Sequence, residues 1–271
     1  MKTFVRVFTF LIFAFLYIPI FVLVVGSFNS GYGVTVFQGF TLNNYAELLN
    51  DSVLLPLLKN SLILAISSSL LATILGTMAA IGIQAMSPKI RSLVMSATNI
   101  PLTNPDIVTG VSLALLFSFI GTALKIDGIL GYTTLLIAHV TFNLPYVILN
   151  VLPKLRQMDP SLRDAALDLG CKPTQAFFKV TIHEIFPGIL SGFIMSFTMS
   201  LDDFVISYFV TGTSFITLPV EIYSYVKKPL PSKIYALFTL IFFAILLLMI
   251  LMSILQARDD KKSRAKLSAR P

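Results

Sequence analysis

Long apolar runs separated by short polar segments dominate the chain. Six windows are long and apolar enough to cross a hydrocarbon core as helices, which takes about 20 residues each. They are Val7–Phe28, Ser61–Ile83, Leu93–Ile120, Leu130–Leu152, Pro187–Phe209 and Tyr235–Ala257. The third and fifth contain prolines or acidic residues, so their ends are less sharply defined. The pattern predicts an all-α polytopic membrane protein with six transmembrane helices.

Composition agrees with this interpretation. Only 12% of the 271 residues are charged, whereas a soluble domain carries about a quarter. The first apolar run is about 22 residues long, which exceeds the roughly 7–15 residues of a signal-peptide core. We therefore expect an uncleaved first helix. A lone cysteine, Cys171, leaves no internal disulfide.

The basic residues indicate an orientation. Cytoplasmic loops of membrane proteins carry an excess of Lys and Arg. Fifteen of the 20 basic residues fall on one side if the N-terminus is cytoplasmic, and they lie before the first window, at 89–91, at 154–179 and in the tail from residue 258. The sequence therefore predicts that both termini and the segment around 159–186 face the cytoplasm. It also predicts a six-span domain over 1–257 and a basic cytoplasmic tail over 258–271.

A polar hairpin interrupts the apolar pattern at about 159–186. Asp159-Pro160 is typical of a helix start, with an oxygen-bearing cap followed by proline at the first helical position. Gly170 is suited to the left-handed residue that ends a helix, and Lys172-Pro173 starts a second helix that leads into the next span. The first helix is thin at Ala165-Ala166, and its edge carries three charged side chains, Arg163, Asp164 and Asp168. Two interpretations stay open on physical grounds: a docking knob for another protein, or an amphipathic helix resting on lipid headgroups.

Three carboxylates, Asp106, Asp202 and Asp203, lie within or at the edges of predicted spans. An ionised side chain near the bilayer centre costs at least about 2.5–3.5 kcal/mol, so such groups normally face a path or a partner. No Lys or Arg lies deep in a span to pair with them. A path with carboxylates and no cations suits a cationic solute, and the aromatic rings of Phe204 and Tyr208 would contact its charge and its apolar stem.

The alternative for these acids is structural. They would then lie near the outer mouth or cap broken helices, and Asp106, which follows Pro105, would cap the second half of an interrupted span. Adjacent residues point to different sides of a helix, so we expect one of Asp202 and Asp203 to face the path.

Other functional classes lack their motifs. The chain contains no G-x-x-x-x-G-K-[ST] nucleotide loop, no H-E-x-x-H and no G-x-S-x-G, and the two histidines, His139 and His183, fall in different segments. We expect no enzyme activity, no cofactor and no metal in this chain. Six helices are few for a complete carrier and no internal repeat is evident, so the chain is expected to be part of a larger assembly.

The hairpin resembles the cytoplasmic signature of permease subunits in bacterial binding-protein-dependent ABC importers. That signature reads Glu-Ala-Ala, three residues, Gly, nine residues, Ile, one residue, Leu-Pro. Asp164-Ala165-Ala166, Gly170 and Val180 stand at the matching positions, and Ile182-His183 replaces Leu-Pro. Four further segments resemble the spermidine/putrescine subgroup, and the likeness runs over nearly the whole chain: "LYIPI" at 16–20, "SFNS" at 27–30, "NPDIV" at 104–108 and "SFTMSLDDFVISYFVTG" at 196–212.

The resemblance implies a type I ABC importer permease fold and a polyamine path. It also implies a second related permease, two ATPase subunits that bind the ATP, an extracellular or periplasmic polyamine-binding protein and a bacterial cell membrane. Arg163, Asp164, Ala165, Ala166, Asp168 and Gly170 become candidates for contact with the ATPase. An importer for another solute, such as ferric iron or an opine-like amine, remains the alternative, and an ion-coupled carrier is a more distant one.

Overall fold

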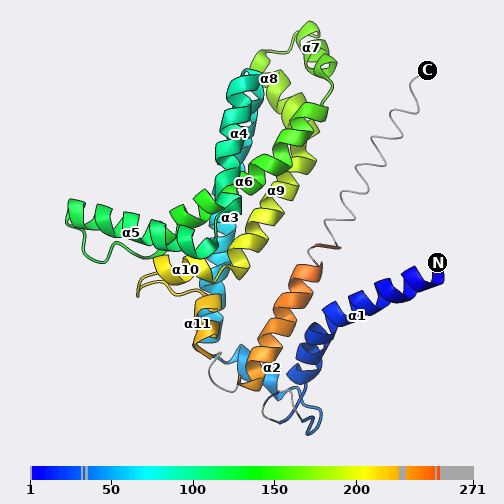
Figure 1. Ribbon diagram of the computed structural model, residues 1–271, viewed down its shortest axis with the longest axis vertical. Coiled ribbons are helices and arrows are strands. Elements are labelled where there is room, and N and C mark those ends of the chain that lie inside the picture. Colours follow the sequence, from blue (N-terminus) through cyan, green and yellow to red (C-terminus); the bar gives the residue numbers. More distant parts are fainter. Residues whose placement is uncertain (1, 32, 34–35, 226–229, 248, 251–271) are drawn as a thin grey trace. The chain divides into compact units, whose positions relative to one another are not determined.

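The computed structural model describes residues 2–31, 33, 36–225, 230–247 and 249–250 (Figure 1). The chain divides into two compact units, one made of Met1–Leu55 and Tyr223–Pro271, the other of Pro56–Ile222. In the described part of the chain the regular elements are helices, and an isolated bridge joins Asn29 to Phe40. The predicted all-α class is confirmed.

The larger unit is a bundle of long helices with a small hairpin at one end. Figure 1 shows α7 and α8 at the end of the bundle opposite α10. The helices of this unit, in chain order, are α3 (Leu54–Ala85, which begins at the end of the other unit), α4 (Pro88–Thr103), α5 (Asp106–Leu124), α6 (Tyr132–Gln157), α7 (Pro160–Asp168), α8 (Pro173–Ala176), a π-helical turn (Phe177–Thr181), α9 (Ile182–Asp202), α10 (Val205–Val210) and α11 (Leu218–Tyr225, whose last residues belong to the other unit).

Small residues let the central helices approach closely. A Cβ on Gly76 of α3 would lie 2.7 Å from Cβ of Val147 on α6, and one on Gly192 of α9 would lie 3.2 Å from Cα of the same residue. Without a hydrophobic drive between helices in lipid, such close backbone contact is a main source of association. Val147 therefore lies at the centre of the packing of α3, α6 and α9, within a buried cluster that also holds Ala72, Ala80, Ile83, Ile148, Val151, Leu152, Leu155 and Ile185.

The predicted third span, Leu93–Ile120, is wrong as one helix. α4 ends at Thr103 and α5 begins at Asp106, and α5 leaves the direction of α4 at a sharp angle (Figure 1). Pro105 has no N–H, and its ring pushes the preceding Asn104 into an extended conformation, with φ −80° and ψ 137°. The interruption that the sequence suggested at Pro105 is therefore present.

The predicted fifth span, Pro187–Phe209, is also wrong in its bounds. The apolar helix runs over Pro173–Asp202, and the chain breaks before α10. No proline or glycine stands at this break. Asp203 adopts φ −63° and ψ 120°, and its carboxylate accepts hydrogen bonds from the backbone of α10, so a side chain replaces the helical carbonyls.

The other windows correspond to helices. Phe4–Ser27, Leu54–Ala85 and Tyr132–Gln157 are long and apolar enough to cross a membrane, in place of the predicted Val7–Phe28, Ser61–Ile83 and Leu130–Leu152. The sixth window, Tyr235–Ala257, overlaps a shorter apolar helix, Ser232–Leu247. Its residues 248 and 251–257, together with the basic tail 258–271, lie outside the described residues.

The smaller unit is organised around two asparagines. The helices α1 (Lys2–Ser27) and α2 (Asn43–Leu49) are joined by a loop. The Asn29 amide donates to the Gly33 and Val36 carbonyls at 2.9 and 2.8 Å, and its oxygen accepts from Gly31 and Gln38 N–H. Asn44 on α2 donates to the carbonyls of Ser27 and Asn29. The loop's backbone is thus satisfied by side chains, as a buried turn requires.

Close packing at Gly188 gives a test of the bundle. A Cβ there would lie 2.8 Å from the backbone oxygen of Asn150 and 2.8 Å from Cγ of Lys154, so Gly188→Ala should destabilise the protein by about 1–3 kcal/mol. Gly82→Ala is the matched control, because a Cβ there meets nothing within 4 Å and alanine favours a helix by about 1 kcal/mol. Thermal unfolding in detergent should show a lower Tm for Gly188→Ala alone. Equal Tm values for the two variants would contradict the packing.

Candidate functional site

The break between α9 and α10 separates the two adjacent carboxylates. Asp202 ends α9 and is exposed, whereas the Asp203 side chain is only 8% exposed. Asp203 accepts backbone hydrogen bonds from Ile206 at 3.2 Å and from Ser207 at 2.8 Å. Its role is that of a cap for the first turn of α10. The two side chains differ in burial because α9 ends between them, and not because they lie on two sides of one continuous helix as predicted.

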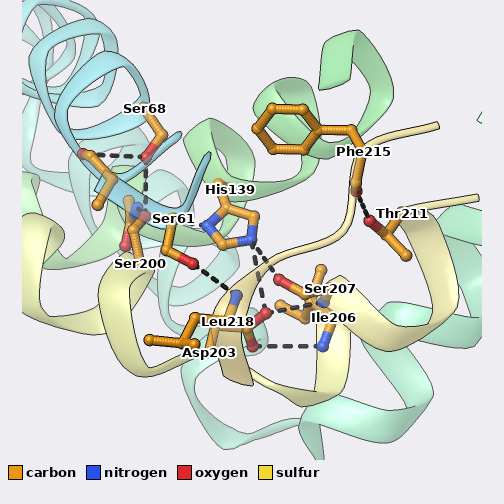
Figure 2. A network of polar contacts seen from close by, with 12 residues as sticks. Ser61, Ser68, His139, Ser200, Asp203, Ile206, Ser207, Thr211, Phe215 and Leu218 are labelled. Atoms are coloured by element: carbon orange, nitrogen blue, oxygen red, sulfur yellow. Dashed lines mark hydrogen bonds and ion pairs between the residues drawn. The ribbon is translucent and has the colours of Figure 1, made fainter. Parts of the chain in front are cut away.

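A buried histidine faces the same break. Figure 2 shows His139 of α6 between Ser200 of α9 and Ser207 of α10. Its Nδ1 lies 3.0 Å from Ser200 Oγ, and its Nε2 lies 3.2 Å from Ser207 Oγ and 3.5 Å from Asp203 Oδ2. Both ring nitrogens of a residue that is 1% exposed therefore have polar partners, as buried polar groups require.

The Ser200 hydroxyl joins three helices. It lies 2.8 Å from Ser68 Oγ on α3 and accepts from Asn143 Nδ2 of α6 at 2.8 Å, in addition to its contact with His139. A hydroxyl offers one donor and two acceptor positions, so these three partners use its full capacity. The network thus ties α3 and α6 to the last turn of α9.

Of the remaining path candidates, Asp106 and Tyr208 are exposed and Phe204 is half-buried. Asp106 is the first residue of α5 and is exposed. The N-cap position of α5 is held by Pro105, with no side-chain cap hydrogen bond, and Asp106 is the next residue. The capping alternative for Asp106 is therefore not confirmed. Tyr208 on α10 is 52% exposed, and its ring centroid lies 5.5 Å from that of Phe204.

Packing brings the start of α5 against α10. A Cβ on Gly110 would lie 3.3 Å from Cα of Ile206 and 3.2 Å from Cδ2 of Phe209. Asp106 stands one helical turn before Gly110, and Asp202 immediately precedes the break that starts α10. The elements that carry Asp106, Asp202, Phe204 and Tyr208 are therefore neighbours in one region of the larger unit.

The polar hairpin has the predicted local structure. Asp159 caps α7 by accepting from Ser161 N–H at 3.0 Å. Gly170 has φ +84°, and the bonds Gly170 N–H to Leu167 O and Cys171 N–H to Ala166 O form the Schellman pattern that ends a helix. The cap prediction and the glycine prediction are both confirmed.

The hairpin presents a mixed polar and apolar surface. Arg163, Asp164, Ala165, Asp168 and Gly170 are exposed, and Ala166 is buried. Leu169 is 87% exposed at the tip. The helical spacing of Leu162, Ala165, Ala166 and Leu169 in the sequence predicts that they share one side of the helix. Leu169 instead protrudes, because it is the C-cap residue at which the helical repeat ends.

The smaller unit contains one further charged pair among the described residues, between Asp51 and Lys233. Nζ of Lys233 lies 2.6 Å from Asp51 Oδ2. Burial acts to raise the pKa of Asp51, but the hydrogen bond from Lys233 and the N–H groups of Leu54 and Val53 outweigh it and lower this pKa below 3.8. The pair therefore stabilises the folded state above the unfolded pKa of the carboxyl, and this contribution is lost as the pH falls through the folded pKa.

Sequence analysis missed the residues that hold Asp203. His139, Ser200 and Ser207 were not predicted, because only Lys and Arg were expected as partners for the carboxylates. One feature of the sequence could have indicated these residues. Ser200 and Ser207 flank Asp203 at a separation of seven residues, and His139 is the only basic-type side chain between Lys125 and Lys154. Which helix faces that histidine cannot be read from one sequence.

A bundle of long apolar helices, two of them broken, with a structured polar hairpin at one end is typical of a polytopic membrane protein. Residues 72–265 match the family described as binding-protein-dependent transport system inner membrane component, and the chain belongs to this family. It is a transport subunit with a type I permease fold.

Individual relatives are similar over almost the full length. The putrescine transport system permease protein PotI of Escherichia coli (strain K12) is 39% identical over 252 residues, which cover 92% of this chain and 89% of PotI. The spermidine/putrescine transport system permease protein PotC of the same strain is 37% identical, with 93% and 92% covered. PotC of Haemophilus influenzae is 36% identical over 254 residues, with 93% and 96% covered.

Solved structures support the fold. A chain of a bacterial ABC transporter that imports the acidic polysaccharide alginate matches with a TM-score of 0.71 at 15% identity, and 95% of each chain is covered. The inward-facing MetNI methionine ABC transporter matches with a TM-score of 0.56 at 18% identity, with 79% of this chain and 95% of that chain covered.

The two carboxylates should differ in their effect on stability. Asp203→Ala removes the acceptor for two backbone N–H groups and should lower the stability of the protein by about 1–3 kcal/mol. Asp202→Ala, at an exposed position, should change it by less than about 0.5 kcal/mol. The Tm values of the two variants in detergent measure the difference. A larger loss for Asp202→Ala would contradict the assigned roles.

Proposed function

We propose that this chain forms part of the translocation path of an ATP-driven importer for polyamines such as putrescine and spermidine. The observation that carries the proposal is the 37–39% identity, over more than nine tenths of the chain, to permeases named for these solutes. The chemistry of the path candidates supports the same substrate class.

The distribution of charged residues in the apolar segments favours a cationic solute. The sequence from residue 180 to 226 contains no Lys or Arg, and the stretch between Arg91 and Lys154 contains one, Lys125. Asp106 and Asp202 are exposed, and the rings of Phe204 and Tyr208 lie beside the α9–α10 break. Carboxylates would bind the ammonium groups of a polyamine, and the aromatic faces would contact its charge and its methylene stem.

The working transporter requires partners. In the proposal a second permease completes the path, two ATPase subunits bind and hydrolyse ATP, and a binding protein outside the membrane delivers the solute. The α7 hairpin docks on an ATPase subunit through Arg163, Asp164, Ala165, Asp168 and the tip around Gly170, and Ala166, which is buried, supports this surface from below. ATP-driven closure of the ATPases then moves the hairpin and opens the path alternately to the two sides.

The proposed orientation places the hairpin and both termini in the cytoplasm of a bacterial cell. The distribution of basic residues supports it, since Lys154 and Arg156 precede the hairpin, Lys172 and Lys179 lie within it, and positive loops stay inside. The Asp51–Lys233 pair would then lie on the outer side.

Uptake of labelled putrescine and spermidine tests the substrate. Cells lacking this gene should lose uptake and recover it when the gene returns, and the ratio of the two rates gives the preferred polyamine. Unchanged uptake in the deletion strain would rule out the polyamine assignment and leave the importer class in place.

Asp202→Asn should lower polyamine uptake about tenfold or more, because a hydrogen bond to a charged group contributes about 1.5–3 kcal/mol. The matched control is Asp127→Asn, which removes the same charge from an exposed loop position after α5. Uptake is measured in cells with equal amounts of permease and of copurified ATPase. Full uptake by Asp202→Asn would remove this carboxylate from the path.

Gly170→Pro should abolish ATPase association and uptake. Proline requires φ near −65°, whereas residue 170 has φ +84°, so the hairpin tip cannot form. Gly170→Asn is the control, because asparagine tolerates the left-handed region and a Cβ at this position meets nothing within 4 Å. Copurification of the ATPase with both variants would exclude the hairpin as the docking element.

A further inference from the structure

We propose that His139 is a positioning residue for the substrate path: it holds Asp203 inward across the α9–α10 break and so leaves Asp202 as the carboxylate presented outward. This inference rests on the proposed function, since it assigns a supporting role to a residue behind the path. Among the described contacts, the imidazole of His139 bridges the two sides of the break, with Ser200 on α9 and with Ser207 and Asp203 at the start of α10.

The geometry of the break makes this bridge possible. In one continuous helix, Ser200 and Ser207 would stand about 10.5 Å apart along the axis, at 1.5 Å per residue. With the break, both hydroxyls lie within 3.2 Å of the same five-membered ring. The imidazole thus connects the end of α9 to the start of α10 across the interruption between Asp202 and Val205.

The hydrogen-bond capacities assign the ring's proton. Asn143 Nδ2 can only donate to Ser200 Oγ, so the serine has one acceptor position and its own hydrogen left for Ser68 and His139. If a neutral His139 carried its hydrogen on Nδ1, the bare Nε2 would face the Asp203 carboxylate at 3.5 Å. In the favourable arrangement Ser68 directs its one hydrogen to Ser200 Oγ at 2.8 Å, in preference to the more distant Ala65 carbonyl at 3.3 Å. Ser200 then donates to Nδ1, and Nε2–H is directed toward Ser207 and Asp203.

In this orientation the Nε2–H dipole stabilises the negative charge of the Asp203 carboxylate and helps keep this side chain turned away from the path. The carboxylate also accepts from two backbone N–H groups of α10, so its oxygens are engaged on the protein side. Asp202, one residue earlier, is exposed. His139 therefore separates an adjacent pair of acids into one structural group and one that is available to a cationic solute.

Two substitutions of His139 test the contacts of the two ring nitrogens separately. His139→Gln places an amide nitrogen near the position of Nε2 and keeps a donor toward Asp203 and Ser207. His139→Asn places its amide near the position of Nδ1 and keeps only the contact with Ser200. In the complete transporter, His139→Gln should retain uptake of labelled putrescine or spermidine to within about threefold of the unaltered protein, and His139→Asn should lose at least tenfold. Equal losses in the two variants, at equal membrane abundance, would overturn the proposal.

A double-mutant cycle provides the second readout. If His139 acts through Asp203, the combination of His139→Asn and Asp203→Asn should transport no more slowly than the slower single variant, because both changes break the same contact. Losses that multiply would mean independent contributions to packing and would overturn the proposal.

The unaltered transporter, the two single variants and the double variant are also purified and compared by thermal unfolding. This measurement reports the coupling of His139 with Asp203 without any substrate. Coupled shifts in Tm support the bridge, and additive shifts overturn it. If coupling is present while the unaltered transporter takes up no polyamine, the bridge stands and the proposed substrate is overturned.

Discussion

The structure depends on one constraint: a backbone in an apolar environment must satisfy its own polar groups. Most of the chain meets it with long helices. The two interruptions in the larger unit meet it differently. At Asn104-Pro105 the proline has no N–H to satisfy, and its carbonyl accepts from the N–H groups of Val108 and Thr109 at 2.9 and 3.2 Å. At the α9–α10 break a carboxylate supplies the missing acceptors. Irregular backbone of this kind is tolerated at membrane depth where protein or a water-filled path surrounds it.

The two breaks therefore indicate where the bundle is specialised. α5 starts at one and α10 at the other, and Gly110 lets these helices cross in close contact. Around this crossing lie the exposed acids and the aromatic pair. The rest of the larger unit is conventional packing, with small residues of α3 and α9 against α6. The contrast between a tightly packed core and a broken polar region is what a transport subunit requires, since part of it must hold its shape while another part faces a solute.

Much of this arrangement was predictable from the sequence, and the failures have physical causes. Length and hydropathy located the spans because bilayer thickness sets a helix length. The α7 hairpin was predictable in detail, since Asp159-Pro160 and Gly170 act on neighbouring backbone groups. The third span was wrong because hydropathy does not register a break at Asn104-Pro105 when apolar residues continue on both sides. The break at Asp203 was missed because its cause is a side chain that folds back on residues three and four positions ahead. His139 was missed because its partners lie 61 to 68 residues away along the chain, and helix packing alone brings them together.

α6 joins the two ends of this unit in a single element. Its C-terminus at Gln157 leads directly into α7, and His139 lies 18 residues before that end, a distance of about 27 Å along a helix. The polar hairpin and the His139 contacts are thus both carried by one helix, which packs along its length against α9. A push on the hairpin would reach the broken region mechanically, as displacement of a helix, without a relay of side chains between them. α6 contains two prolines, Pro145 and Pro153. Because proline removes a helical hydrogen bond, these are the positions at which α6 would bend under such a displacement.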